Sequence, residues 1–360
     1  MYIPPLLQSL MPSLFSGVFD LPWWGYAAVA LALTHVTIVA VTVFLHRHQT
    51  HRGLELHPAA SHFFRLWLWL TTGMRTREWV AVHRKHHARC ETPDDPHSPA
   101  ILGINRVLWG GVLLYVKESA KPETIERFGY GTPDDWLERN VYSKHVVLGL
   151  TLMGLADLVL FGIVPGVLIF LTQIAWIPFW AAGVINGVGH HFGYRNWPTE
   201  DVSTNIVPLG ILIGGEELHN NHHACAPSAK FSVKWYEFDL GWMYIRLLAA
   251  TGLATVKRLA PVPRFVAPKP VVDLQTLQAV ITNRYHVLAG YAASLGRLPV
   301  GESAAAQTMN AMRHELVALW ARSMATREQL VAQLQDWCRR AEASGIAPLA
   351  EFSRHLRSYA

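Results

Sequence analysis

The feature that most constrains this chain is the near absence of charge over two long stretches. Residues 146–185 contain a single charged residue, Asp157, and residues 1–45 contain only Asp20. A water-facing surface does not lack charge over such lengths, whereas a bilayer-spanning helix needs about 20 consecutive apolar residues. Because lipid offers no hydrogen bonds to the backbone, the spans must be helical. The sequence therefore predicts an all-α integral membrane protein.

Residues 22–45 are long enough for one span, with Trp23 and Trp24 as interfacial anchors at one end. Residues 1–20 are apolar but interrupted by prolines, which is typical of an interfacial or re-entrant piece. Residues 146–190 are twice as long as one span requires and contain breakers at Gly162 and Pro165-Gly166. This length and these breakers predict two antiparallel spans, 146–163 and 168–189, in addition to the first span. We therefore expect three to four transmembrane helices.

A hairpin of two spans returns the chain to the side from which it entered. Residues 46–145 and everything after residue 190 then share one face, which the retention of Lys and Arg predicts to be cytoplasmic. Residues 63–82 combine apolar and charged side chains, as in a helix at the membrane surface. The net charge of +5 is spread over mixed surfaces without a basic stripe, which excludes nucleic acid as a partner.

The character of the chain changes after a proline-rich linker at residues 261–272. Residues 273–360 carry apolar residues at helical spacing and predict a small cytoplasmic helical C-terminal module of unknown role. Residues 1–260 form the membrane domain, in which the transmembrane helices carry a cytoplasmic, histidine-rich helical cap.

Nineteen histidines are an excess that requires explanation, and most are clustered. The clusters are His46, His48 and His51; His83, His86 and His87; His219, His222 and His223; and the pair His190 and His191. In the second and third clusters the spacing i, i+3, i+4 puts all three imidazoles on one helical face. His46 and His51 differ, because residues five apart are about 140° apart around an α-helix. They either reach two adjacent metal ions, or reach one if the helix frays.

Imidazole ligands suit zinc, copper, iron and nickel alike, so the ligands alone do not decide the metal. No HExxH peptidase motif is present, and the three cysteines lack the spacing of a cluster site. An imidazole-rich metal pair at a membrane surface suits oxygen activation on an apolar substrate. A metal transporter would need ionisable residues along its spans, and the spans offer only His35 and Asp157. Acidic residues near the clusters are candidates for orienting the imidazoles: Glu78, Asp94, Asp95, Glu216 and Glu217.

Four stretches together resemble the membrane-bound fatty acid desaturases, and in detail the acyl-CoA (stearoyl-CoA type) delta-9 branch. They are FLHRHQTHRGLELHP, WVAVHRKHHARCETPDDPH, INGVGHHFGYR and GEELHNNHHACAP. The resemblance covers about residues 24–240. His190 enters because GHHFGYR is similar to a family motif with one histidine, in which the position of His191 is usually apolar.

The resemblance implies two iron ions held by nine histidines, with Asn186 approaching one iron through water. The nine are His46, His51, His83, His86, His87, His190, His219, His222 and His223. It further implies that O2 and two electrons remove two hydrogens from a saturated fatty acyl chain, leaving a cis double bond at the delta-9 position. The sequence has no haem motif of its own, so a separate ferredoxin or cytochrome with its reductase must supply the electrons. A related hydroxylase would use the same centre and remains the alternative.

The chain departs from the acyl-CoA branch at two places. Ala81-Val82 stand where that branch usually has an Arg-Asp pair, and Ser98-Pro99-Ala100 stand where it has a basic pair. In the family those charges face the CoA headgroup, so their loss removes several phosphate partners. Both acyl-CoA and acyl-phospholipid therefore remain candidates for the acyl carrier.

Overall fold

The computed structural model describes residues 14, 16–298, 303–321 and 325–360, so most of the predicted piece at residues 1–20 lies outside the described residues. The chain divides into two compact units. The first runs to Ala260, apart from Trp197–Thr199, and the second comprises those three residues and Pro261–Ala360. Helices dominate both units, in agreement with the predicted all-α class.

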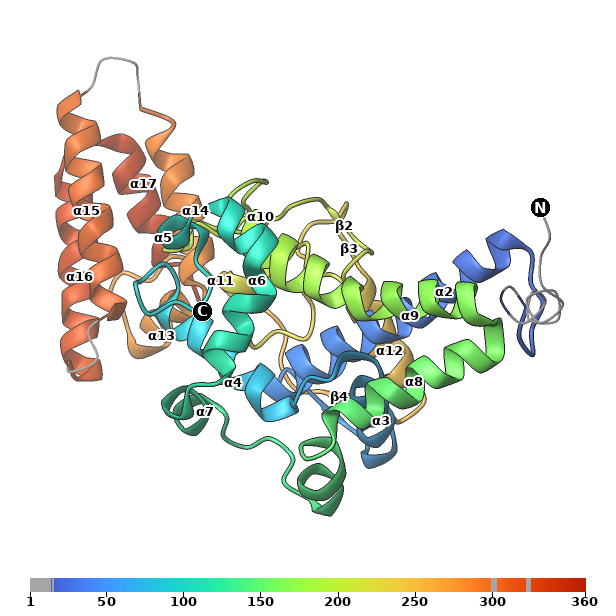
Figure 1. Cartoon of the computed structure of the whole chain (residues 1–360). Helices are drawn as coiled ribbons and strands as arrows, with labels where there is room; N and C mark the ends of the chain where they lie inside the picture. The colour runs from blue at the N-terminus through green and yellow to red at the C-terminus, as the bar shows by residue number, and fades with distance from the viewer. Residues whose placement is uncertain (1–13, 15, 299–302, 322–324) are drawn as a thin grey trace, which may run out of the picture. The chain divides into compact units, whose positions relative to one another are not determined.

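The first unit contains the charge-poor segments and the histidine clusters, and Figure 1 shows its course. Its elements, with π-helices labelled η, are α2 (Trp23–Val39), η1 (Ala40–Thr50), β1 (Leu54–Leu56), α3 (Pro58–Thr72), α4 (Thr76–Arg89), α5 (Pro99–Leu102), α6 (Ile104–Ser119), α7 (Pro122–Phe128), η2 (Glu138–Tyr142), α8 (Val146–Phe161), α9 (Ile163–Ile177), η3 (Pro178–Ile185), α10 (Asn186–Val188), β2 (Leu209–Gly210), α11 (His219–Ala224), β3 (Phe238–Asp239), α12 (Leu240–Ala250) and β4 (Ala254–Val256). The short strands pair β1 with β4 antiparallel, and β2 with β3 parallel.

Two continuous helices are long and apolar enough to cross a membrane by length and composition, Trp23–Thr50 and Ile163–Val188. The first unites α2 with η1, and the second unites α9, η3 and α10. Helix α8 is also apolar but has 16 residues, or about 24 Å at 1.5 Å per residue. That length is short of a hydrocarbon core of about 30 Å. The helices are thus consistent with membrane association, and the number of crossings stays a prediction.

Helices α8 and α9 form the hairpin that the breaker residues predicted, and they lie side by side in Figure 1. The reversal is tighter than expected because Gly162 alone separates the helices, with a left-handed φ of 87°. Pro165 consequently lies in the first turn of α9, where its missing N–H is not needed. Within the hairpin, Gln173 Nε2 donates to the buried Asp157 carboxylate over 2.8 Å.

Helix α6 (Ile104–Ser119) is an element that was not predicted from the sequence. It packs closely against η3, because a Cβ atom on Gly111 would lie 2.1 Å from the carbonyl oxygen of Ala182. The glycine thereby lets the two backbones touch. This contact brings α6 beside the histidine-bearing part of the unit.

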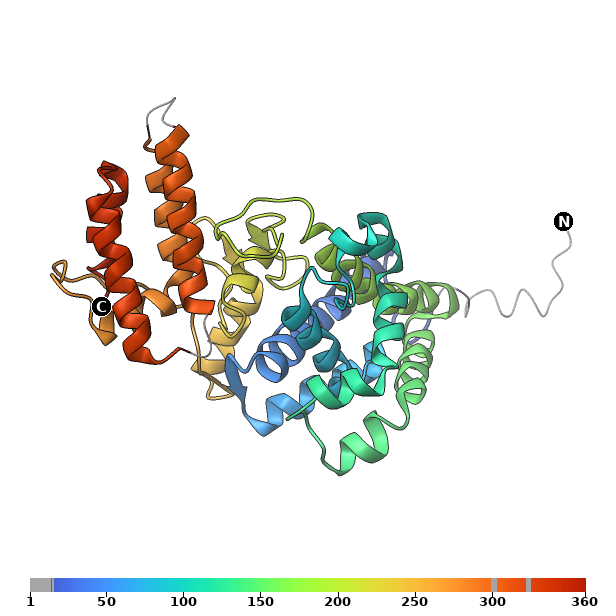
Figure 2. The ribbon, with the colours of Figure 1, turned by 90° about the vertical axis from the view of Figure 1, so that its left-hand side faces the viewer.

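The second unit is a helical bundle with its own core, drawn in orange and red in Figures 1 and 2. Its helices are α13 (Leu274–Thr282), α14 (Arg284–Leu295), α15 (Ser303–Ala321), α16 (Arg327–Ala343) and α17 (Ala347–Leu356). Trp337 fills the centre, and its indole N–H donates to the Met312 carbonyl over 2.9 Å. From Leu274 onward, the described residues of this unit are mainly helical.

Candidate metal centre

The π-helix η1 determines how His46 and His51 are presented. In a π-helix each N–H bonds to the carbonyl five residues earlier, and the His51 N–H donates to the His46 carbonyl over 3.1 Å. Residues five apart therefore lie almost one above the other, and the two ring centroids are 4.9 Å apart. The separation of about 140° assumed an α-helix, which this segment is not. Both rings join one group without fraying.

The other two clusters each divide between two groups of imidazoles. His83 and His87 on α4 face η1, while His86, which precedes His87, points away by about 100° around the helix. On α11, His222 joins the first group, while His219 and His223 join the second. Each triplet, which the spacing placed on one helical face, is thus divided between two neighbouring groups of ligands.

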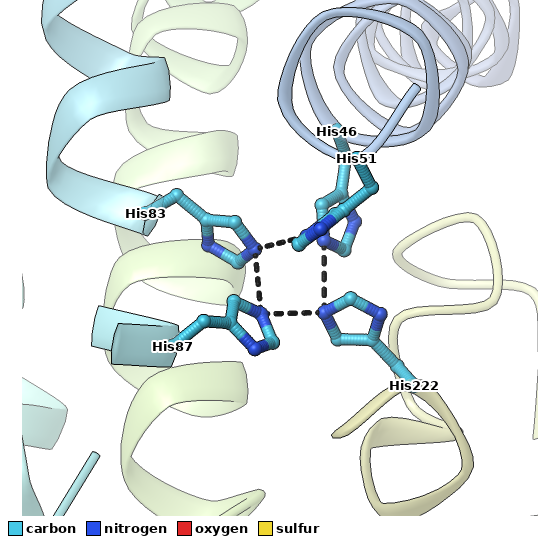
Figure 3. A group of neighbouring side chains, drawn as sticks. All are labelled: His46, His51, His83, His87 and His222. Atoms are coloured by element: carbon cyan, nitrogen blue, oxygen red, sulfur yellow. Dashed lines mark hydrogen bonds between the residues drawn. The ribbon is translucent and has the colours of Figure 1, made fainter. Parts of the chain in front are cut away.

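The first group consists of five imidazoles whose Nε2 atoms meet at a common point, as Figure 3 shows. We call it the five-histidine group; its members are His46, His51, His83, His87 and His222. The Nε2 of His222 lies 2.8 Å from that of His87 and 3.1 Å from that of His46. The Nε2 of His83 lies 3.1 Å from those of both His87 and His51.

The second group consists of four imidazoles and is called the four-histidine group. Its members are His86, His190, His219 and His223, with ligand nitrogens within 4.8 Å of one another. His190 comes from the turn after α10, and its Nε2 lies 3.0 Å from that of His219. The adjacent His191 is exposed and outside both groups. The two groups are neighbours, since the ring centroids of His87 and His223 are 4.5 Å apart.

Four of the nine imidazoles are held from behind by carboxylates. The Nδ1 contacts are His46 to Glu216 at 2.7 Å, His86 to Asp95 at 2.9 Å, His190 to Glu91 at 3.0 Å and His223 to Asp201 at 3.0 Å. Because a carboxylate only accepts, each Nδ1 must donate, and each Nε2 is left with a lone pair. Carboxylates in this position fix the tautomer and orientation of metal-binding histidines.

The sequence indicated only two of these carboxylates, Asp95 and Glu216. Of the other predicted acids, Glu78 pairs with Arg75 and Glu217 accepts from the backbone, so neither holds an imidazole. Glu91 and Asp201 were missed. They are far along the chain from the histidines that they contact, and no local spacing connects them.

The donor set fits metal ions at both points. Nitrogen ligands at about 2.1 Å from an ion and at right angles to each other are about 3 Å apart, which matches the separations of the Nε2 atoms. Inward-facing lone pairs that meet without a donor between them are unfavourable unless a cation binds. In the four-histidine group the buried Nε2 of His223 has no hydrogen-bond partner among the described residues. Each of the two groups could therefore hold a metal ion.

Burial lowers the pKa of seven of the nine imidazoles and so favours their neutral form. Desolvation lowers the pKa of His86 from 6.5 to about 3. It also lowers the pKa well below 6.5 for His51, His83, His87, His219, His222 and His223. Neutral imidazole is the form that binds metal.

The lowered pKa values predict that stability is lost in acid. Unfolded histidines bind protons below about pH 6.5, and the folded ones do not until the pH is much lower, so the unfolded state is favoured as the pH falls through that range. Each unmatched proton contributes about 1.4 kcal/mol per pH unit. We expect the thermal midpoint of the metal-free protein to fall between about pH 7.5 and about pH 5.5. A midpoint that stays constant over this range contradicts the burial argument.

A cavity of about 490 Å³ runs past both groups, a size typical of small-molecule sites. His46 and His83 of the five-histidine group and His219 of the four-histidine group line it. Its other walls are mainly apolar and include Val41, Val82, Val116, Ile177, Ala181, Ile185 and Ile213. Asn186, which the sequence placed near one metal ion, lines the same cavity. The groups therefore face a space suited to an apolar chain.

Fold and site together define a helical, membrane-associated protein with two histidine groups fit to hold metal ions beside an apolar cavity. The model of the fatty acid desaturase family matches residues 21–258, and the chain belongs to that family. It is therefore an oxidoreductase that desaturates fatty acyl chains.

Relatives of known activity have similar sequences over most of their length. The chain is 32% identical over 264 residues to an sn-1 stearoyl-lipid 9-desaturase of Anabaena variabilis, covering 71% of this chain and 89% of that one. It is 31% identical over 250 residues to Delta-9 acyl-lipid desaturase 1 of Arabidopsis thaliana, covering 66% and 76%. An acyl-CoA 5-desaturase of Anemone leveillei is 32% identical over 252 residues, covering 67% and 74%.

Proposed function

We propose that this protein is a di-iron desaturase that inserts a cis double bond at the delta-9 position of a saturated acyl chain carried by a phospholipid. The single observation that carries the proposal is the apolar cavity lined by histidines of both groups. A methylene pair in this cavity would lie beside both candidate metal points at once.

The five- and four-histidine groups would each hold one iron ion, with Asn186 reaching one of them through water. When bound, the irons would supply the redox chemistry that removes two hydrogens from adjacent methylenes. These two hydrogens, together with O2, two electrons and two protons, form two water molecules. The chain's own residues hold the imidazoles in place through Glu91, Asp95, Asp201 and Glu216. The apolar walls exclude water from the reacting carbons.

The residues at the two positions where the chain departs from the acyl-CoA pattern favour a phospholipid as the acyl carrier. Ala81 is fully buried and Val82 lines the cavity, so neither offers a charge to a CoA phosphate. The Ser98 hydroxyl donates to Glu91 over 2.7 Å and thereby supports the carboxylate behind His190. The names of the relatives from Anabaena and Arabidopsis point the same way.

The proposed function also implies how the protein lies in the membrane and where its electrons come from. The helices from Trp23, Val146 and Ile163 would cross the bilayer, leaving the histidine groups on the cytoplasmic face. Electrons would come from a separate ferredoxin or cytochrome with its reductase.

The acyl carrier can be tested directly. Purified protein, with iron and an electron-donor system, is given stearoyl-phosphatidylcholine and stearoyl-CoA in separate reactions, and products are located by mass spectrometry. We expect a delta-9 double bond in the intact phospholipid and at least about tenfold less product from the CoA ester. Desaturation of the CoA ester alone contradicts the lipid carrier, and an alcohol in place of the alkene contradicts the desaturase reaction.

A further inference from the structure

Tyr115 is a polar residue in the cavity that none of the contacts described so far explains. It lies in the last third of α6, and its side chain lines the cavity. Its hydroxyl is buried and has no hydrogen-bond partner among the residues that the structure describes. A buried hydroxyl without a partner is unfavourable, so its persistence in a substrate cavity points to a partner that arrives with the substrate.

The neighbouring charges do not satisfy this hydroxyl. Arg75 and Glu78 also line the cavity, but they pair with each other over 2.7 Å, and Arg75 Nε donates to the Ser143 carbonyl over 2.8 Å. Burial raises the pKa of Tyr115 above its usual value, so the hydroxyl keeps its proton and is a donor. The hydrogen of this hydroxyl is therefore free to be donated to an acceptor.

Tyr115, Arg75 and Glu78 form a polar part of the cavity wall, and this part lies at the outer end of the cavity. The Arg75 side chain is 42% exposed, and Val116, next to Tyr115, is 55% exposed. Gln173 and Ile177, which also line the cavity, are buried. An acyl chain that enters methyl end first would leave its carboxyl end beside Tyr115.

The dimensions of α4 agree with that orientation. Glu78 and Arg75 precede His83 by five and eight residues, or about 8 and 12 Å along the helix at 1.5 Å per residue. An extended chain advances about 1.2 Å per bond, so eight or nine bonds span about 10–11 Å. A carbonyl held at the outer end would thus leave the ninth and tenth carbons near the histidines.

We propose that the Tyr115 hydroxyl donates a hydrogen bond to the carbonyl oxygen of the acyl ester and thereby selects which carbons face the two histidine groups. Tyr115 is then a specificity-determining residue that touches the substrate. The inference rests on the proposed function, because it needs an acyl ester in this cavity.

The test is Tyr115→Phe, which removes the hydroxyl and keeps the ring. Tyr142→Phe is the matched control, since Tyr142 lies in the same unit, is also half-buried and does not line the cavity. The first measurement is binding of tritiated stearoyl-phosphatidylcholine to each iron-loaded protein without an electron donor, so that no turnover is needed. The second is the position of the double bond in the products once electrons are supplied.

For Tyr115→Phe we expect roughly tenfold weaker binding, as for the loss of one buried hydrogen bond, and double bonds spread to positions next to delta-9. The Tyr142→Phe protein should match the wild type in both respects, and neither substitution should lower the thermal midpoint. Unchanged affinity and unchanged double-bond position in Tyr115→Phe overturn the inference. If the wild type binds the lipid but forms no alkene, the proposed function fails, and the binding comparison still decides the role of Tyr115.

Discussion

With the proposed di-iron centre, replacing His222 with alanine should abolish desaturation and leave the protein with about one metal ion in place of two. His222 is fully buried, and its Nε2 is the one that approaches both His46 and His87 in the five-histidine group. Removing an outer-shell partner of a metal site already costs 10–100-fold in affinity or activity, so loss of an inner ligand should cost at least about 100-fold. Product formation is measured by mass spectrometry and metal content by elemental analysis.

His191→Ala is the matched control for that experiment. His191 is exposed and adjacent to His190, yet belongs to neither histidine group. Its replacement should leave both activity and metal content unchanged. Full activity in His222→Ala, or an equal loss in His191→Ala, would refute the assignment of ligands by geometry.

The second large effect is expected from Arg47→Met, which should destabilise the fold by about 3–5 kcal/mol. Arg47 is completely buried, and its two terminal nitrogens bond to Asp239 over 2.8 and 3.1 Å. The same guanidinium donates to the carbonyls of Gly214 and Ala229. Its loss leaves the Asp239 carboxylate buried without its charge partner and releases η1 from the segment that leads into α11.

Two comparisons make this measurement decisive, with the free energy of unfolding read from chemical denaturation. Arg139→Met removes an exposed ion pair with Asp134 and should change stability by no more than about 1 kcal/mol. The double variant Arg47→Met/Asp239→Leu should recover part of the loss, because no unpaired charge then remains. A loss below about 1 kcal/mol in Arg47→Met alone would show that this pair does not hold the site together.

The sequence was sufficient to find the histidines because the motifs are local. A spacing of three or four residues is readable without knowing the fold, and so is a charge-free stretch such as residues 146–185. The division of each triplet between two groups was not readable in this way. It depends on which neighbour approaches α4 from each side, and that is decided by tertiary packing.

The parts that escaped prediction are long-range contacts. His190 and Glu91 are separated by 99 residues, and α6 reaches the cavity only because Gly111 lets it touch η3. Tyr115 has no motif at all, and its significance comes from a missing hydrogen-bond partner in a cavity that the sequence cannot outline. Residues of this kind become visible only once the fold brings distant segments together.

The π-helical pitch of η1 is also tied to the length of the histidine motif that it carries. An α-helix would bring ligands together with three intervening residues, whereas here four stand between His46 and His51. Deleting one of these four residues would be absorbed locally only if the wide turn became an α-helical one. The number of residues between the two histidines and the pitch of this segment must therefore change together.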